Sequence, residues 1–423
     1  MNPHDDAYAS LRIPAIRNYI GGRFLATAGR QMLGVAIGWE LYDRTSSTLA
    51  LGLVGLVQVV PVVLLALPAG HLVDRKNRRD VAVLANILLT LCGLALTLIS
   101  LFHGPVWAIY ATLFVQGVGM SFESPSTGSL MAQIVPPPLF ANANAWRSSS
   151  WQLAATGGPA VAGFLIAAFH GAAWVYAISV VGGALFTLTL LILPRPPTPA
   201  PSAGAPKDEL RAGLKFVFST ELLLSAITLD LFAVLFGGAT ALLPAFARDV
   251  LRVGASGLGW LRAAPSIGAL VMALVTTKLP PWKRPGQVLL FTVAGFGVAT
   301  LGFGYSTSFA LSMVCLAFTG VFDNISVVIR LTLEQLLTPD RLRGRVSAVH
   351  YVFIGLSNEM GEFESGITAA LLGPVGSVVL GGIGTLVVVA LVALRWPALR
   401  KLPPLSGLRP ADDPGAPSKV ATG

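Results

Sequence analysis

The sequence predicts an all-α membrane protein with twelve transmembrane helices arranged as two six-helix pseudo-repeats. Apolar residues make up 54% of the 423 positions, whereas Asp, Glu, Lys and Arg make up only 12%. That is about half the share of charged residues in a typical soluble protein. The composition therefore argues against a soluble fold and against disorder. Apolar runs long enough to cross a bilayer recur along the chain, with polar or Pro/Gly-rich breaks between them.

Each apolar run is expected to be a helix, because lipid offers the backbone no hydrogen-bond partners. The expected spans are 17–41, 50–73, 80–103, 106–135, 141–169, 172–193, 216–245, 255–279, 286–305, 308–337, 344–371 and 375–396.

The basic residues predict the orientation of these spans. If both termini are cytoplasmic, 21 of the 29 Lys and Arg residues lie in cytoplasmic segments and 3 lie on the opposite side. Such a bias is typical of membrane proteins. The net charge of +9 then indicates the anionic inner surface of a membrane, and not nucleic acid, as the partner. We expect a multi-pass protein of the cell inner membrane, in contact with the lipid bilayer.

The longest polar break, PRPPTPAPSAGAPKDELRAGLK, divides the spans six and six. Its Pro, Ala and Gly content is typical of a flexible or polyproline-like linker. The expected segments are a cytoplasmic N-terminal tail (1–16), an N-terminal six-helix bundle (17–193), a cytoplasmic linker (194–215), a C-terminal six-helix bundle (216–396) and a disordered cytoplasmic tail (397–423).

Two breaks, one in each half, have similar sequences. They read SLMAQIVPPPLFANANA and LTLEQLLTPDRLRGRVSA. Gln133 aligns with Gln335 and Pro137 with Pro339, both at an offset of 202 residues. We interpret the halves as distant duplicates. Secondary transporters are commonly built from such repeats, with a substrate site near the bilayer midplane between them.

The loop between the second and third spans reads GHLVDRKNRR. It resembles the loop signature of the major facilitator superfamily, Gly-x-Leu-x-Asp-Arg-x-Gly-Arg-Arg. The matching residues are Gly70, Leu72, Asp74, Arg75, Arg78 and Arg79. Asn77 stands in place of a glycine and tolerates the same left-handed turn. The resemblance implies the major facilitator fold and a cytoplasmic gate in this loop. Asp74 is expected to cap the next helix or to pair with an arginine of another span. A basic turn that fixes topology is a compatible interpretation.

The fifth span contains ATGGPAVAGF, with Gly157, Gly158 and Pro159. This stretch is similar to the Gly-Pro-rich motif of proton-driven exporters in the superfamily, where it would bend the helix and restrict leak. Plain close packing is the alternative. Two second-half stretches, LPAFARDVLRVGASGLGWLRAAPSIGAL and SNEMGEFESGITAALLGP, are similar to the branch of enterobactin and related drug exporters. One departure is Leu113, which stands where many proton-coupled exporters carry an arginine.

Charged residues within the spans are costly in lipid, so they indicate a polar interior. Arg23, Thr27 and Arg30 lie on one face of span 1. Arg30 is expected to line a cavity, where it would hold an anionic substrate or tune a carboxylate, or else to be a structural partner. Arg23 is expected to be structural or to reach the inner surface. Glu123 in span 4 is a candidate for proton or substrate coupling. The alternative is a fixed ion pair with Arg147 or an arginine of span 1.

Asp230 in span 7 is a second coupling candidate. Span 10 adds Asp323 and Arg330 as candidates. Arg330 lies one turn from Glu334, so a local pair within the helix is expected.

Glu359 and Glu362 lie one turn apart in span 11. Two neighbouring carboxyls raise the pKa of one of them, which suits a proton site. A structural role for the stretch GEFESG, which contains Glu362, is the alternative.

Other classes of membrane protein lack support in the sequence. It contains no Gly-x-Ser-x-Gly, no His-Glu-x-x-His, no pair of Asp-rich motifs and no G-x-x-x-x-G-K-[ST], so neither an enzyme nor a nucleotide-driven pump is expected. The five histidines have no metal-ligand spacing and both cysteines lie in apolar runs. We expect no metal, no cofactor and no disulfide framework.

The expected function is secondary active transport. The resemblance implies a proton-coupled exporter that works by alternating access. The mixed aliphatic and aromatic spans favour an amphipathic small molecule as the substrate, such as a siderophore or a drug-like compound. The expected partners are a small-molecule substrate, protons and lipid, and the expected state is a monomer. An importer or facilitator of a small metabolite is the main alternative, and a membrane-embedded enzyme is a more distant one.

Overall fold

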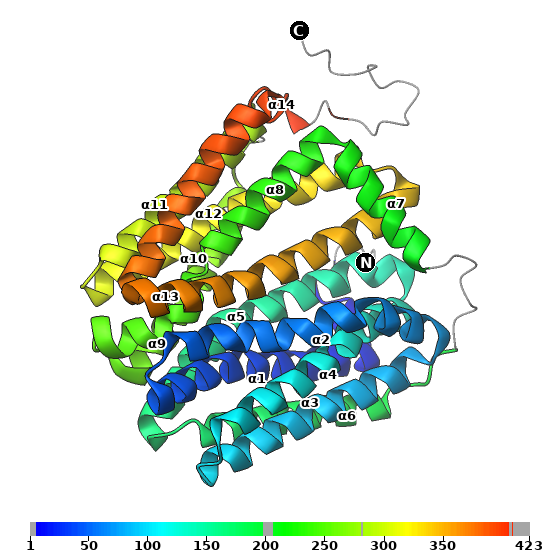
Figure 1. Ribbon diagram of the computed structural model, residues 1–423. Helices are drawn as coiled ribbons and strands as arrows, with labels where there is room; N and C mark the ends of the chain where they lie inside the picture. Colours follow the sequence, from blue (N-terminus) through cyan, green and yellow to red (C-terminus); the bar gives the residue numbers. More distant parts are fainter. Residues whose placement is uncertain (1–5, 198–205, 281, 406–407, 409–423) are drawn as a thin grey trace. The chain divides into compact units, whose positions relative to one another are not determined.

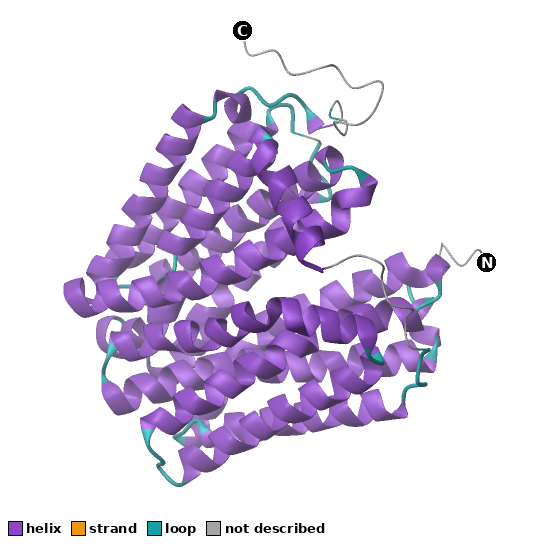
Figure 2. Cartoon of the chain, turned by 45° about the vertical axis from the view of Figure 1, so that its right-hand side comes forward, coloured by secondary structure: helices purple, strands orange, loops and turns teal. Residues whose placement is uncertain are grey.

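All regular structure in the described residues is helical (Figure 2). The computed structural model describes residues 6–197, 206–280, 282–405 and 408. The chain divides into two compact units. Unit 1 comprises Met1–Ala203 with Pro244–Ala263, and unit 2 comprises Gly204–Leu243 with Ala264–Gly423.

Unit 1 contains six long helices. They are α1 (Pro14–Thr45), α2 (Thr48–Arg75), α3 (Arg78–Leu101), α4 (Val106–Ile134), α5 (Phe140–Phe169) and α6 (Ala173–Ile192), with short 3-10 turns η1 (Ser10–Arg12) and η2 (Pro137–Leu139) (Figure 1). α1 packs against α5 and α6, α3 packs against α4 and α6, and α2 packs against α4. A segment from later in the chain belongs to the same unit. It includes most of α9 (Leu243–Ala245), the π-helical turn η4 (Phe246–Val250) and the start of α10 (Gly254–Thr276).

Local signals in the sequence set the starts of the first three helices. Pro14 occupies the first turn of α1, where a missing N–H is tolerated. The side chain of Ser47 caps α2 by accepting a hydrogen bond from the backbone N–H of Ala50 at 3.3 Å. The side chain of Asn77 caps α3 in the same way, with the N–H of Arg79 at 3.1 Å.

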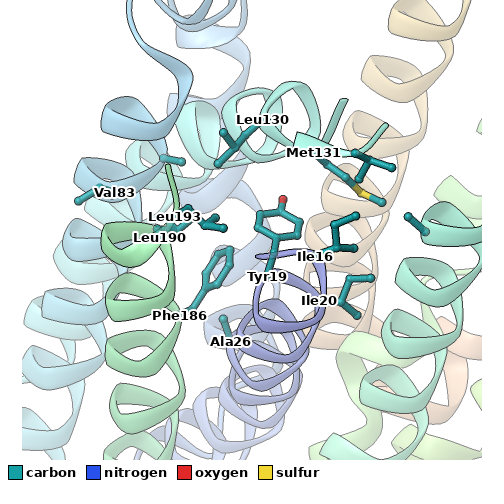
Figure 3. Packing of buried hydrophobic residues seen from close by; sticks show 13 residues of the cluster. Ile16, Tyr19, Ile20, Ala26, Val83, Leu130, Met131, Phe186, Leu190 and Leu193 are labelled. Atoms are coloured by element: carbon teal, nitrogen blue, oxygen red, sulfur yellow. The ribbon is translucent and has the colours of Figure 1, made fainter. Parts of the chain in front are cut away.

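The core of unit 1 contains a buried tyrosine near the start of α1 (Figure 3). The Tyr19 ring meets the Phe186 ring of α6 edge to face, with centroids 5.8 Å apart. Its hydroxyl donates to the carbonyl of Thr127 in α4 at 2.8 Å, which satisfies the one polar atom of the buried side chain. Ile16 and Leu130 complete the contact, so α1, α4 and α6 are held in register beside the polar site described below.

Unit 2 contains the remaining elements. They are α7 (Pro206–Ser219), α8 (Glu221–Phe236), η3 (Ala239–Leu242), the later part of α10, α11 (Pro285–Tyr305), α12 (Phe309–Leu337), η5 (Asp340–Leu342), α13 (Arg343–Arg395) and α14 (Pro397–Arg400). α8 and α11 pack against α13, and α11 packs against α12.

α13 is two helices separated by a break. Gly373 has φ 77° and ψ 163°, a conformation outside the helix that glycine adopts without the steric penalty of a side chain. Pro374 follows directly and cannot donate a backbone hydrogen bond to the preceding turn. This break falls between the expected spans 344–371 and 375–396.

Two expected unstructured segments are partly ordered. Pro206–Ser219 is a helix, although we expected a flexible linker to 215. Val217 of this helix packs against Val346 and Val349 of α13. This packing stabilises the helix, because a short helix gains most of its stability from tertiary contacts. The tail from 397 begins with α14, and its Leu399 is buried. Within these two segments, residues 198–205, 406–407 and 409–423 lie outside the described residues.

Nine helices among the described residues are long and apolar enough to cross a membrane, which makes the chain a multi-pass membrane protein. α1 and α4 do not meet this criterion, because charged and polar side chains interrupt them. α13 meets it as one element but covers two expected spans.

The hairpin α4–η2–α5 has the same backbone pattern as α12–η5–α13. Val135 after α4 (φ −96°, ψ 124°) matches Thr338 after α12 (φ −93°, ψ 123°). Pro136 (φ −57°, ψ 140°) matches Pro339 (φ −58°, ψ 146°). These positions differ by 203 residues, as do Val106 and Phe309 at the helix starts. The structure therefore corrects the register of the alignment by one residue, and Pro136 rather than Pro137 is the counterpart of Pro339.

Candidate functional site

Unit 1 holds a buried carboxylate between two arginines of one helix. Only 5% of the Glu123 side chain, on α4, is exposed. Its Oε1 accepts a hydrogen bond from Arg23 at 2.5 Å and lies 3.3 Å from the guanidinium of Arg30. A carboxylate away from water is stable only when it is paired and hydrogen-bonded. Glu123 therefore ties α4 to two positions on α1 that lie about two turns apart.

Helical spacing brings both arginines to the same acid, because positions 23, 27 and 30 share one face of α1. Arg30 also donates to the hydroxyl of Thr27 at 3.5 Å. The guanidinium of Arg23 lies 5.9 Å from the centre of the Phe186 ring, within cation–π range. Arg23 does not reach for the inner surface, as one expectation had it, because the buried carboxylate attracts it into the unit.

Arg147 was the other expected partner of Glu123. Its guanidinium instead donates to Oδ1 of Asn144, one turn earlier on α5, at 2.8 and 3.0 Å. Of the two expected pairings, the structure has the one with the arginines of span 1.

A small cavity adjoins Arg30. Its volume is about 20 Å³, and its polar lining comes from Arg30, Asn86, Thr90, Gln116 and Ser179. That space suits about one water molecule and is too small for an organic substrate.

Unit 2 has an ion pair between α8 and α12. The guanidinium of Arg330 pairs with Asp230, and 4% and 10% of the two side chains are exposed. The Nε of Arg330 donates to the hydroxyl of Ser326 at 3.2 Å. Asp323 interacts electrostatically with both Arg330 and Asp230. The structure thus brings together three of the predicted site residues, with two carboxylates around one arginine.

Glu334 has partners other than the expected one. Its Oε1 accepts a hydrogen bond from Ser347, and its Oε2 contacts Nδ1 of His350. Both partners belong to α13. We expected Arg330 and Glu334 to pair along α12, but the ion pair of Arg330 is with Asp230. Helix packing supplies each of them with a partner from another helix, which the spacing along α12 does not reveal.

Glu359 and Glu362 lie one turn apart on α13, and both are partly exposed. Their role as a shared proton site stays a prediction.

The loop from Gly70 to Arg79 joins α2 to α3. Asp74 is exposed and lies 3.9 Å from Arg78, its partner within the loop. Asn77 has φ −63° and ψ 119°, so the expected left-handed turn and the expected cap by Asp74 are both wrong. The physical reason is that the amide oxygen of Asn77 caps α3, and a capping residue is extended. Arg75 is exposed as well.

The same loop holds the end of α6. Asn77 donates through Nδ2 to the carbonyl of Pro196 at 2.6 Å. Arg79 donates through Nε to the carbonyl of Leu190 at 2.7 Å and also to the carbonyl of Leu191. Since the last carbonyls of a helix lack partners within it, Arg79 caps α6.

The residues of the Gly-Pro motif on α5 have different surroundings. A Cβ on Gly158 would lie 2.9 Å from Cβ of Gln31 and 3.1 Å from the carbonyl of Ala28, whereas a Cβ on Gly157 would meet no atom within 4 Å. Pro159 is buried within the helix. Gly158 is therefore the residue that allows α5 to approach α1.

The sequence reasoning missed a contact between the C-terminal end of α1 and the π-helical turn η4. The hydroxyl of Tyr42 donates to Asp249. Arg248 lies 3.4 Å from Asp43, and its guanidinium sits 5.8 Å from the centre of the Tyr42 ring. Tyr42 and Asp249 are 207 residues apart, so no local spacing could have indicated the contact.

Glu40 was also missed. It is 7% exposed and pairs with Arg44 on the next turn of α1. The i, i+4 spacing of opposite charges was the available signal.

Buried arginine–carboxylate pairs inside a many-helix membrane bundle are characteristic of membrane transporters. Residues 19–361 match the family model of the Major Facilitator Superfamily, and the chain belongs to this family of transporters. The family resemblance of the loop is thereby confirmed, and the protein is a transporter rather than an enzyme.

Two similar relatives are enterobactin exporters named EntS. The one from Shigella flexneri is 29% identical over 389 residues, which cover 92% of this chain and 93% of the relative. The one from Escherichia coli O1:K1 / APEC is 28% identical, with the same coverage.

Solved structures of other transporters have the same fold. One is a bacterial homologue of the human lysosomal transporter Spinster, in an inward-facing and unoccupied conformation. Its TM-score is 0.67 at 14% identity, and the match covers 92% of this chain and 96% of the homologue. A D-xylose–proton symporter has a TM-score of 0.70 at 12% identity, with 90% and 97% covered. These likenesses bear on the fold alone.

Proposed function

We propose that this protein is a proton-coupled exporter of an amphipathic small molecule, either a siderophore or a drug-like compound, that works by alternating access. The observation that carries the proposal is Glu123, buried between Arg23 and Arg30 of α1. The names of the EntS relatives support export and the siderophore class. In this proposal twelve helices in two six-helix repeats cross the inner membrane, both termini are cytoplasmic, and the monomer is the working unit.

Glu123 is proposed as the coupling carboxyl. When ionised, it holds both arginines and fixes α4 to α1. A proton bound at Glu123 removes the charge that attracts them, so the contact between the helices loosens. Arg30, at 3.3 Å the more distant partner, is then the first to be freed. Entry of the proton from outside and its release inside would drive the change of access state.

Asp230, Asp323 and Arg330 form the corresponding proposed site in unit 2, and Glu359 and Glu362 are proposed as a further proton site. The loop from Gly70 to Arg79 is proposed as the cytoplasmic gate. The Asp74–Arg78 pair, at 3.9 Å, is its loosest contact, because Asp74 is exposed and exposed pairs contribute little.

The test uses inside-out membrane vesicles with an imposed acid interior. A panel of siderophores and amphipathic drugs is added, and the collapse of the proton gradient is followed. The wild-type protein should dissipate the gradient with one compound class, and Glu123→Gln should not, although it should retain substrate binding. Asp340→Asn is the control, because Asp340 is an exposed acid paired with its neighbour Arg343. Uphill transport that persists in Glu123→Gln would remove Glu123 from the mechanism.

The same panel addresses the alternative of a facilitator or importer. Substrate movement that equilibrates across the membrane without a change in the proton gradient would support a facilitator. In inside-out vesicles loaded with the substrate, its movement out of the lumen against its concentration gradient would support an importer.

A further inference from the structure

The end of α12 and the start of α13 carry a buried pair of a glutamate and a histidine. Each oxygen of the carboxylate has a partner on α13. Glu334 lies in the last turn of α12 and is 6% exposed, and His350 of α13 is 4% exposed. Ser347 donates to Oε1 of Glu334, and Nδ1 of His350 contacts Oε2. An ionised carboxylate accepts hydrogen bonds and donates none, so the neutral imidazole carries its proton on Nδ1.

This tautomer leaves Nε2 of His350 as the basic nitrogen. Nε2 is buried and has no hydrogen-bond partner among the described residues. Histidine is the side chain whose charge ordinarily changes between about pH 5 and 8. The ring is therefore placed to accept a proton at Nε2 while the hydrogen bond from Nδ1 to Glu334 stays intact.

A cluster of charged residues lies next to the pair along α12. Arg330 pairs with Asp230, and it interacts electrostatically with Asp323 and with Glu334, which lies one turn farther along α12. With His350 neutral, three carboxylates share one arginine. Uncompensated charge is costly in a buried site, and a proton on His350 removes part of the imbalance.

The helices packed against the pair carry further charged residues. On α7, Arg211 and Lys215 are exposed, and on α8 Glu221 lies at the exposed N-terminus. α11 has no Asp, Glu, Lys, Arg or His in its sequence. On α13, Arg343 pairs with Asp340. α13 also carries Arg345 near its start and, farther along, Glu359, Glu362, Glu364 and Arg395.

The duplicated hairpin gives an independent comparison. With the offset of 203 residues found above, His350 corresponds to Arg147 of α5, and Ser347 corresponds to Asn144. In unit 1 these two residues are hydrogen-bonded to each other, and Met131 stands in place of Glu334. The position that holds a permanent cation in unit 1 thus holds a titratable group beside a carboxylate in unit 2.

We propose that His350 and Glu334 form a proton-binding site in unit 2, in which Nε2 of His350 takes up the proton and Glu334 stabilises the imidazolium. No bond within the protein breaks in this step, since the ring gains a proton from solvent and later returns it. The inference deepens the proposed function, on which its role in transport rests, because it adds a second proton site to that of Glu123.

The first test observes the ring directly and needs no transport. The protein is labelled with ¹⁵N-histidine, and the His350 signal is identified as the one that His350→Gln removes. The measurement covers about pH 5 to 8, the range over which histidine ordinarily changes its charge. In the wild type the protonated ring should lose the proton at Nε2 as the pH rises. In Glu334→Gln the protonated fraction should be smaller at the same pH, because the carboxylate that stabilises the imidazolium is gone. A ring that keeps one protonation state over this range, or a titration that Glu334→Gln leaves unchanged, would overturn the proposal.

The second test compares His350→Gln with His350→Lys in proteoliposomes. Glutamine keeps a donor for Glu334 without a charge, whereas lysine supplies a fixed cation like the one at Arg147. If the site carries a proton during transport, both variants should flatten the pH profile of substrate-driven proton flux over pH 5 to 8. A merely structural role predicts an unchanged profile at a lower maximal rate, and that result would overturn the role in transport. If the wild type shows no proton flux with any substrate, the proposed function fails, and the histidine titration still decides the site.

Discussion

Arg23 and Glu123 lie 100 residues apart in the chain and form a hydrogen-bonded ion pair of 2.5 Å between α1 and α4. In unit 2, Asp230 of α8 and Arg330 of α12 form a similar pair. Here the acid is on the earlier helix and the arginine on the later one, the reverse of unit 1. The Asp230–Arg330 pair is buried, and in the other pair Glu123 is buried and Arg23 is partly buried. A buried charge resists the loss of its partner far more than the pair resists the loss of both members. This asymmetry makes their contributions measurable.

Removing Arg23 should destabilise unit 1 more than removing Arg23 and Glu123 together. Arg23→Gln leaves the buried carboxylate with Arg30 alone, which should cost about 3 kcal/mol, the lower end of the range for broken buried pairs. The double variant Arg23→Gln/Glu123→Gln should recover most of this loss. Denaturant unfolding of purified protein in detergent measures both. Arg147→Gln is the control and should change stability by less than about 0.5 kcal/mol. Additive effects of the two changes would contradict the pairing.

Arg330→Met should be more destabilising than Asp230→Asn. Arg330 compensates Asp230 and Asp323 and also interacts with Glu334, so its loss leaves several buried carboxylates without a cation. Asp230→Asn removes one negative charge and leaves Arg330 with Asp323. The difference should be about 1–2 kcal/mol within the range for buried charges, measured by the same unfolding assay. The reverse order would show that Asp230 rather than Arg330 organises the cluster.

Neighbouring glycines of the motif on α5 should respond differently to alanine. Gly158→Ala places a methyl group 2.9 Å from Gln31, so it should destabilise the protein by about 1–3 kcal/mol, as overpacking does. Gly157→Ala meets no atom within 4 Å and should stabilise the helix by up to about 1 kcal/mol. Melting temperatures of the two variants in one detergent provide the comparison. Equal effects would mean that the motif bends α5 rather than allowing it to approach α1.

The hydroxyl of Tyr42 should hold η4 against α1. Tyr42→Phe removes the hydrogen bond to Asp249 and keeps the ring beside Arg248, so it should cost about 1 kcal/mol. Amide hydrogen exchange in Phe246–Val250 should quicken accordingly. Tyr305→Phe, at an exposed position, is the control. Unchanged exchange in η4 would show that the contacts of Arg248 with Tyr42 and Asp43 are enough to hold the turn.

Much of the fold is determined by the sequence, because lipid excludes any backbone conformation that leaves its polar groups unpaired. Hydropathy therefore locates helices such as Val106–Ile134 within one or two residues of the expected span. Gly373 and Pro374 mark the break in α13 for a local steric reason. The loop motif led to the correct family, but not to the role of Asn77, since a residue that tolerates a left-handed turn also makes a good cap.

The partners of the buried charges depend on the tertiary structure. Spacing along α1 places Arg23 and Arg30 on one face, yet it does not say whether that face meets Glu123. Along α12 it suggested a pair between Arg330 and Glu334, whereas Asp230 and His350 take those places. The period of a helix fixes which of its side chains lie together. The rotation of the helix and the identity of its neighbours are set by packing among segments a hundred or more residues apart, and that packing decides which buried charges compensate one another.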